Sequence, residues 1–309
     1  MSYSIVFPGQ GSQSVGMLGE LAEDFNVVKE VFQEASDALS IDLWNMCQTD
    51  NESLNQTINT QPAMLTAGYA TLSVLKEECD LKPLSYAGHS LGEYTALVAA
   101  ESIEFYDAIK LVRKRAELMQ DAVPSGTVGM AAILGLSDEE VINVCLSYDG
   151  EGVIEPVNFN SPGQVVVAGS KQAVDEICEL MKEAGAKRAV PLQVSVPSHC
   201  SLMDSASDKF SAFVNETNIQ LPNNSVIHNV GAVSADSVDQ IKECLIDQIK
   251  KPVLWTQTIS NMSNLGVERI IECGPGKVLA GLTRRINKNL SVNAIIDKSS
   301  LEETIKEIS

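Results

Sequence analysis

Several features that would define a function class are missing from this 309-residue sequence. No apolar run approaches the roughly eighteen residues needed to span a bilayer, and Met1 to Ser4 lack the basic stretch of a secretory signal. We therefore expect no membrane association. The net charge of −19 argues against nucleic-acid binding through a broad basic face.

Paired cysteines and nucleotide-binding motifs are also missing. The seven cysteines are odd in number and none forms a C-x-x-C pair, which indicates neither a disulfide framework nor a zinc site. A reducing cytoplasm is the expected location. The glycines at 9 and 11 do not form a P-loop, and the dinucleotide pattern G-x-G-x-x-G fails at Ser14. We expect no metal and no cofactor.

One pentapeptide, Gly88-His89-Ser90-Leu91-Gly92, has the pattern of a serine nucleophile. Residues 84–87 before it predict a short buried strand, and residues 93–100 after it predict a helix. A serine in such a sharp turn is strained and exposed at the helix N-terminus. Glycines two residues to either side are needed because strand and helix pass too close for a Cβ atom. We therefore predict that Ser90 is a nucleophile.

A serine nucleophile needs a base, and the sequence has three histidines, His89, His199 and His228. His89 should point away from Ser90 in a turn of this kind, and His228 lies in an apolar strand pattern that favours a core residue. His199 lies in a loop after the last strand of segment 126–195, where catalytic side chains concentrate. We expect His199 to be the base. No acid between serine and histidine carries a signal for a triad, and a backbone carbonyl would serve to orient the imidazole.

The expected helix over 105–119 carries two arginines near its apolar face. Arg115 shares a row with Leu111 and Met119, whereas Arg113 flanks the opposite edge. A partly buried guanidinium requires an anion, and its planar fork matches a carboxylate through two parallel hydrogen bonds. A salt bridge to an acidic residue is the alternative role. Helical geometry alone does not choose between the two arginines.

Strands alternate with helices along most of the chain. This order predicts an α/β fold with a mostly parallel sheet flanked by helices, and places the serine turn at the carboxyl end of one strand. One helix is expected to begin near Thr60, with Pro62 in its first turn, where the missing N–H costs nothing.

Residues 126–195 have a different pattern: a strand, a helix, two strands joined by a turn, a helix and a last strand over 187–194. The order βαββαβ is typical of a ferredoxin-like α+β unit. We therefore expect an inserted subdomain over 126–195, within a large α/β domain made of residues 1–125 and 196–309.

Together these motifs resemble the malonyl-CoA:acyl carrier protein transacylase family of fatty-acid synthesis. The resemblance spans nearly the whole chain and implies a hydrolase-like α/β fold with a ferredoxin-like insertion. It is carried by seven motifs in order, which are Phe7–Gln13, Gln61–Ala63, Gly88–Tyr94, Arg115 before Met119-Gln120, Asn158–Gln164, Val196–His199 and Gly274–Lys277.

The resemblance implies a role for each residue of the reacting centre. Ser90 would attack the thioester, and His199 would take its proton. The backbone N–H groups of Gln10 and Leu91 would form the oxyanion hole. The backbone carbonyl of Gln248 would orient His199, which accounts for the absent acid.

The resemblance also implies the substrate and the order of events. Arg115, rather than Arg113, would hold the free carboxylate of the malonyl group. A malonyl-Ser90 intermediate would form as coenzyme A leaves, and the phosphopantetheine thiol of acyl carrier protein would then accept the acyl group. The sequence Val196-Pro197-Ser198-His199 resembles the free-standing fatty-acid enzyme more than multidomain polyketide relatives, so we expect a stand-alone bacterial-type enzyme.

Two other functions stay open. The same serine could serve a hydrolase acting on a carboxylated acyl-CoA, or the chain could be a non-catalytic scaffold that binds a carrier protein. A scaffold would need none of Ser90, His199 and Arg115. The expected partners are malonyl-CoA and acyl carrier protein, with the chain acting as a monomer. Basic residues available to an acidic partner are Lys250-Lys251, Lys277, Arg284-Arg285 and Lys288.

Overall fold

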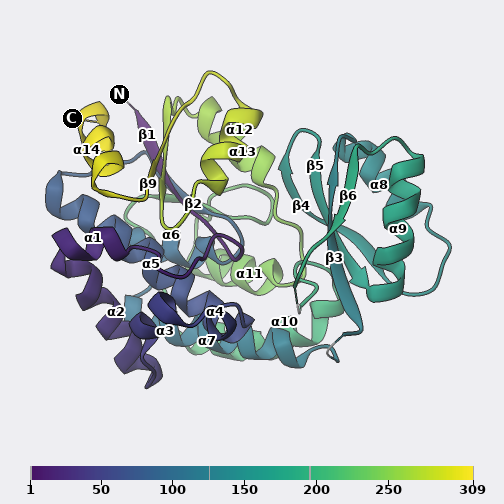
Figure 1. The fold of residues 1–309 in the computed structure, drawn as a ribbon, viewed down its shortest axis with the longest axis horizontal. Coiled ribbons are helices and arrows are strands. Elements are labelled where there is room, and N and C mark those ends of the chain that lie inside the picture. The colour runs from purple at the N-terminus through teal and green to yellow at the C-terminus, as the bar shows by residue number, and fades with distance from the viewer. Residues whose placement is uncertain (1, 125, 195, 309) are drawn as a thin grey trace.

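The computed structural model describes residues 2–124, 126–194 and 196–308. It contains two separate sheets, seen on the left and right of Figure 1. Residues 125 and 195, at the predicted edges of the insertion, lie outside the described residues. The large sheet consists of β1 (Tyr3–Phe7), β2 (Ser85–Gly88), β7 (Ser225–Ile227), β8 (Arg269–Cys273) and β9 (Ser291–Ile295). The small sheet consists of β3 (Val128–Leu134), β4 (Ile154–Ser161), β5 (Gln164–Ser170) and β6 (Arg188–Pro191).

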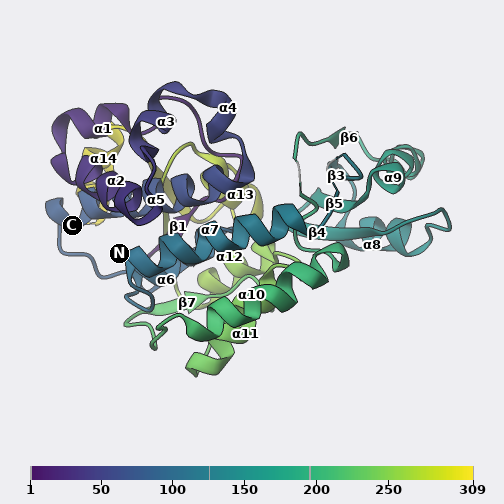
Figure 2. The same cartoon turned by 90° about the horizontal axis from the view of Figure 1, so that it is seen from below.

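Helices pack against both faces of the large sheet, and two helices pack against one face of the small sheet (Figures 1 and 2). None within the described ranges is long and apolar enough to cross a membrane. The helices that precede the small sheet are α1 (Gly19–Asp24), α2 (Asn26–Leu39), α3 (Leu43–Thr49), α4 (Asn51–Leu54), α5 (Thr57–Glu78), α6 (Gly92–Ala99) and α7 (Phe105–Asp121). Those that follow are α8 (Asp138–Leu146), α9 (Lys171–Glu183), the 3₁₀ turn η1 (Ser201–Met203), α10 (Asp204–Glu216), α11 (Val238–Gln248), α12 (Trp255–Asn264), α13 (Val278–Ile286) and α14 (Lys298–Ile308).

The large sheet is parallel throughout, as the alternation of strands and helices predicts. Its strands lie in the order β7-β2-β1-β8-β9. Ile5 and Phe7 of β1 belong to one apolar core, whereas Val6 between them belongs to a second core with Trp255 of α12 and Leu279 of α13. Both faces of β1 are therefore buried, which explains why Ile5, Val6 and Phe7 form a continuous apolar run.

The small sheet is antiparallel, with strand order β4-β5-β3-β6. Its order along the chain, β3-α8-β4-β5-α9-β6, confirms the ferredoxin-like pattern. Ser137 caps the start of α8 and forms a capping box with Glu140. The expected last strand over 187–194 is too long. The observed β6 ends at Pro191, because the Val194 N–H donates to the Leu192 carbonyl at 3.1 Å in a local turn.

The expected start of the helix near Thr60 is wrong. Helix α5 begins at Thr57, which places Pro62 beyond the first turn, where its missing N–H would leave a carbonyl without its helical donor. Nη1 of Arg113 donates to the Ile58 carbonyl at 3.2 Å and replaces that donor. A contact from another helix therefore allows the proline at this position.

Candidate active site

Ser90 lies in the sharp turn between β2 and α6, close to the predicted boundaries of strand and helix. Its φ of +52° is a left-handed conformation that a serine rarely adopts. The glycines permit the turn: a Cβ on Gly88 would lie 1.9 Å from the Gly92 carbonyl carbon, and a Cβ on Gly92 would lie 2.1 Å from the Phe7 carbonyl oxygen. The close approach predicted from the Gly-x-Ser-x-Gly spacing is therefore present.

A buried asparagine holds the backbone of this turn. Asn229 follows β7, the strand that pairs with β2. Its Oδ1 accepts a hydrogen bond from the Ser90 N–H at 2.7 Å, and its Nδ2 donates to the Gly88 carbonyl at 2.6 Å. The sequence analysis missed this residue. The sequence did contain a signal for it: Asn229 is a polar residue that follows a short apolar strand, and polar residues at the carboxyl ends of parallel strands often form sites.

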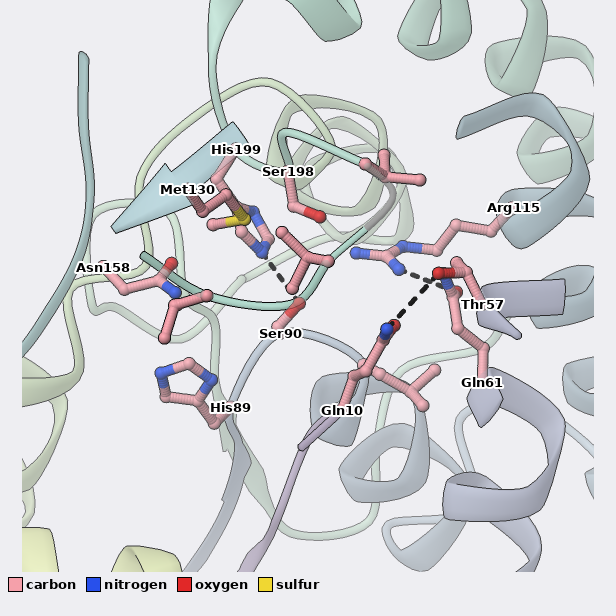
Figure 3. Close-up of a pocket in the computed structure, with 14 residues that line it drawn as sticks. Gln10, Thr57, Gln61, His89, Ser90, Arg115, Met130, Asn158, Ser198 and His199 are labelled. Atoms are coloured by element: carbon pink, nitrogen blue, oxygen red, sulfur yellow. Dashed lines mark hydrogen bonds between the residues drawn. The ribbon is translucent and has the colours of Figure 1, made fainter. Parts of the chain in front are cut away.

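His199 meets Ser90 across 109 positions of sequence. Its Nε2 lies 2.7 Å from Ser90 Oγ, as Figure 3 shows, and its Nδ1 lies 2.6 Å from the backbone carbonyl oxygen of Gln248. The His199 N–H donates to the Ile249 carbonyl at 2.9 Å, which fixes the loop with φ +70°. A serine hydroxyl, an imidazole and an orienting acceptor are thus aligned without an acidic side chain.

The environment of His199 keeps its imidazole neutral. Burial, followed by the positive charge of Arg115, lowers the pKa of His199 to about 3. The hydrogen bond to Gln248 acts in the opposite direction but does not outweigh them. At neutral pH the ring therefore has a free nitrogen lone pair that can accept a proton.

The other two histidines have partners of their own. His89 points away from Ser90 (Figure 3), and its Nε2 contacts Asn160 Oδ1 at 2.7 Å. Burial lowers the pKa of His89. His228 lies directly after β7 rather than within a strand, and its Nδ1 contacts Glu93 Oε1 at 2.7 Å in the core. As expected, His89 and His228 each contact a partner other than the Ser90 hydroxyl.

Arg115 extends from α7 into the pocket beside Ser90 (Figure 3), with only 1% of its surface exposed. Its Nη1 donates to Gln61 Oε1 at 2.7 Å and its Nη2 to Gln248 Oε1 at 3.0 Å. Burial lowers the pKa of Arg115, but a guanidinium stays protonated in proteins. The two amide oxygens that hold it are neutral, so the site retains a positive charge able to receive an anion.

Arg113 is occupied elsewhere, which decides between the two arginines of α7. It contacts Glu117 at 3.2 Å, the Ile58 carbonyl at 3.2 Å and Asn59 Oδ1 at 3.0 Å. Of the two, only Arg115 lines the pocket. The direction of these side chains depends on neighbouring helices, which is why helical spacing alone did not choose.

The pocket around Ser90 is a cavity of about 120 Å³, and Met130 and Asn158 of the small sheet form part of its lining. Gln10 and Leu91 line it together with Ser90, Arg115 and His199. Within the described residues, the backbone N–H groups of Gln10 and Leu91 donate to no other group. They are therefore available to an oxygen atom bound in the pocket.

A second pocket adjoins the first and shares Gln10, His89, Asn158 and Leu192 with it. It continues along α13. Across the described ranges, no cluster of three or more histidine, cysteine or acidic side chains has the arrangement of a metal site. The side chains that line the pocket include a serine, a neutral histidine and a buried guanidinium.

Comparison with known proteins places this chain in a family. The model of the acyl transferase domain matches residues 4–302. The chain belongs to the acyl transferase domain family. This membership agrees with the hydrolase-like α/β fold and its ferredoxin-like insertion.

Relatives with similar sequences and structures cover nearly the whole acyltransferase chain. The malonyl CoA-acyl carrier protein transacylase of Haemophilus influenzae is 50% identical over 97% of this chain and 98% of its own. The enzyme of the same name from Escherichia coli is 47% identical over 98% of this chain and 99% of its own.

Among solved structures, an acyl carrier protein S-malonyltransferase from Vibrio cholerae is 51% identical, with a TM-score of 0.96 over 98% of this chain and all of that one. A malonyl-transacylase in complex with its type II PKS acyl-carrier protein is 46% identical. Its TM-score is 0.98 over 99% of this chain and all of that one.

Proposed function

We propose that this acyltransferase transfers the malonyl group from malonyl-CoA to the phosphopantetheine thiol of acyl carrier protein, supplying fatty-acid synthesis. The observation that carries the proposal is the Ser90 Oγ–His199 Nε2 contact of 2.7 Å in a pocket that also contains the buried Arg115. A nucleophile, a base and a carboxylate-binding cation in one pocket fit a carboxylated acyl thioester. The names of the relatives support this substrate class.

In the first half-reaction, Ser90 Oγ attacks the thioester carbonyl carbon while His199 Nε2 takes the hydroxyl proton. The backbone N–H groups of Gln10 and Leu91 stabilise the negative charge on the carbonyl oxygen. As the C–S bond breaks, the imidazolium returns the proton to the departing sulfur of coenzyme A. The malonyl carboxylate meanwhile pairs with Arg115.

In the second half-reaction, the carrier thiol gives its proton to His199 and attacks the malonyl-Ser90 ester, and the serine oxygen recovers a proton. The pocket along α13 would receive the phosphopantetheine arm, since it opens directly onto His89 and Gln10. Arg284 and Arg285 at the end of α13 are candidates to meet an acidic carrier protein. Lys250 and Lys251 already lie against Asp204 and Asp247, at 3.5 and 2.7 Å, respectively.

We also propose that the protein acts as a monomer in the cytoplasm, with 126–195 as an inserted subdomain between the parts 1–125 and 196–309 of the catalytic domain. All seven cysteines are free thiols, which suits a reducing compartment. The small sheet contributes Met130 and Asn158 to the pocket. The insertion would therefore form one wall of the substrate site.

Mass spectrometry after incubation with malonyl-CoA tests the proposal. We expect a malonyl adduct on the peptide that contains Ser90, and its disappearance with formation of malonyl carrier protein when the carrier is added. Release of free malonate in the presence of carrier protein would instead show the hydrolase. An unmodified chain would show the non-catalytic scaffold.

A further inference from the structure

Glu93 is a fully buried carboxylate directly behind the serine turn. It lies in the first turn of α6, in which it is the only charged residue. Its Oε1 contacts Nδ1 of His228 at 2.7 Å. Its Oε2 accepts hydrogen bonds from the Asn229 N–H at 2.9 Å and from Nε2 of Gln248 at 2.8 Å. Three segments that are distant in sequence therefore meet at one side chain.

Gln248 extends this network to the reacting groups. Its Nε2 also donates to the Ser90 carbonyl at 2.8 Å, while its Oε1 accepts from Nη2 of Arg115 at 3.0 Å. Its own backbone carbonyl contacts His199 Nδ1. One residue thus contacts the nucleophile, the histidine and the arginine.

The chemistry of these partners permits only one orientation of the Gln248 amide. Glu93 and the Ser90 carbonyl are acceptors, so the NH₂ group must face them. Arg115 is a donor only, so the amide oxygen must face the guanidinium. The Glu93 carboxylate therefore determines which end of Gln248 reaches Arg115.

We propose that Glu93 is a positioning residue that sets the preference for a carboxylated acyl group, by fixing Gln248 and through it the guanidinium of Arg115. This inference rests on the proposed function. Glu93 does not line the pocket itself, so it acts on the substrate indirectly. Gln248 leads from Glu93 to Arg115, whereas Asn229 leads from it to the Ser90 turn, which malonyl and acetyl donors share.

Another buried carboxylate provides a contrast within the same molecule. Glu272 on β8 is also fully buried, but it accepts hydrogen bonds from the backbone N–H groups of Leu279 and Ala280, at 3.1 and 2.8 Å. These bonds hold the start of α13. Glu272 has the partners of a purely structural residue, whereas the partners of Glu93 lead to Ser90 and Arg115.

Two substitutions separate hydrogen bonding from packing. Glu93→Met keeps a long side chain but cannot accept the two N–H bonds from Asn229 and Gln248. Glu93→Gln keeps one acceptor oxygen for both donors, and its NH₂ group can face His228 when Nδ1 is the unprotonated nitrogen. Gln is therefore the conservative variant that should rescue the position.

The test compares acylation of Ser90 by malonyl-CoA with acylation by acetyl-CoA, which offers no carboxylate to Arg115. The quantity compared is the malonyl-to-acetyl ratio, which is kcat/KM for malonyl-CoA divided by kcat/KM for acetyl-CoA. We expect Glu93→Met to lower this ratio about tenfold, and Glu93→Gln to keep it near the wild-type value. Glu272→Met is the matched control, because it also removes a buried acceptor of two N–H bonds, and it should lower the unfolding temperature without changing the malonyl-to-acetyl ratio. Equal losses for both donors in Glu93→Met, or no rescue by Glu93→Gln, would overturn the inference.

A double-mutant cycle provides a second readout. In an Arg115→Ala background the ratio should no longer respond to Glu93→Met, because the group being positioned is gone. If Glu93→Met does not fold, Glu93→Asp, which withdraws the carboxylate by one methylene, takes its place in the cycle. The wild-type chain separates failure of the proposed function from failure of this inference. Absence of a malonyl adduct on the wild type would refute the proposed function. A normal adduct on the wild type, with an unchanged malonyl-to-acetyl ratio in the variants, would refute only the role of Glu93.

Discussion

Nδ1 of His199 lies 2.6 Å from the backbone carbonyl oxygen of Gln248. A carbonyl oxygen can only accept a hydrogen bond, so the proton of the neutral imidazole resides on Nδ1. The lone pair of Nε2 therefore faces Ser90 Oγ, at 2.7 Å. This contact supplies the tautomer that a general base needs, and it does so without a carboxylate.

The first prediction concerns Ser90→Ala. Removing the hydroxyl leaves no atom to form the ester, so malonyl-CoA should leave the chain unmodified. Intact-mass spectrometry measures the adduct directly. Ser205→Ala, at an exposed position of α10, is the control and should retain the adduct. A malonyl adduct on the Ser90→Ala variant would assign the nucleophile elsewhere.

The second prediction compares the two arginines of α7. Arg115→Ala should lower kcat/KM for malonyl-CoA by about ten- to a hundredfold, because a charge-assisted pair with the carboxylate is lost. We expect acetyl transfer to be slow and to persist in this variant. Arg113→Ala removes the donor to the Ile58 carbonyl and should lower stability while leaving the malonyl-to-acetyl ratio intact. Normal turnover of malonyl-CoA by Arg115→Ala would refute the role assigned to this arginine.

The third prediction concerns the pH dependence of acylation. Since burial and the charge of Arg115 lower the pKa of His199 to about 3, the base is already neutral throughout the ordinary titration range of histidine. The kcat/KM for malonyl-CoA should therefore show no inflection near pH 6.5. Stopped-flow measurement of coenzyme A release between pH 5 and pH 8 checks this. A single-proton decline centred near pH 6.5 would contradict it.

The fourth prediction is that the lowered pKa of His199 reduces the stability of the folded chain in acid. The folded-state pKa of about 3 lies below the ordinary value of 6.5, so between these values the unfolded chain binds more protons than the folded one. The stabilisation is complete above pH 6.5 and should fall by about 1.4 kcal/mol per pH unit below it. Urea unfolding from pH 7 to pH 5 should show a steeper decline for the wild type than for His199→Gln. Parallel plots of unfolding free energy against pH for the two proteins would show that the pKa of His199 is not lowered on folding.

The last prediction concerns the glycines. Gly92→Ala would bring a Cβ to 2.1 Å from the Phe7 carbonyl oxygen, so strand and helix must separate. We expect a loss of about 3 kcal/mol or more in the free energy of unfolding. Gly281→Ala is the control, because a Cβ there meets nothing within 4 Å on α13. That variant should gain about 0.5–1 kcal/mol from the lower entropy of its unfolded chain. Equal stability of the two variants would contradict the close packing at Gly92.

Local sequence patterns were sufficient to predict much of the fold and the turn that contains Ser90. The turn at Ser90 could be read because its strand, glycines and helix occupy fewer than twenty consecutive residues. The capping box at Ser137 and the βαββαβ order are equally local. In contrast, α5 begins earlier than the sequence predicts. Pro62 is tolerated inside this helix because Arg113, on another helix, donates a hydrogen bond to the Ile58 carbonyl.

The side chains that hold the site were the least predictable. Asn229 and Glu93 are polar residues beside apolar elements, and nothing in their own surroundings indicates that they meet. The side chain of Gln248 is a similar case, since its contacts with Ser90 and Arg115 span 158 and 133 positions.

The sequence by itself determined the chemical groups, the strained serine turn and the order of elements, because these depend on residue type and on spacing within a few turns of chain. Tertiary structure decided which arginine of α7 enters the pocket, and which distant side chains hold the serine turn and the guanidinium, namely Asn229, Glu93 and Gln248. Those outcomes depend on packing between distant segments around one parallel sheet, where burial and hydrogen-bond geometry select partners that no local pattern encodes.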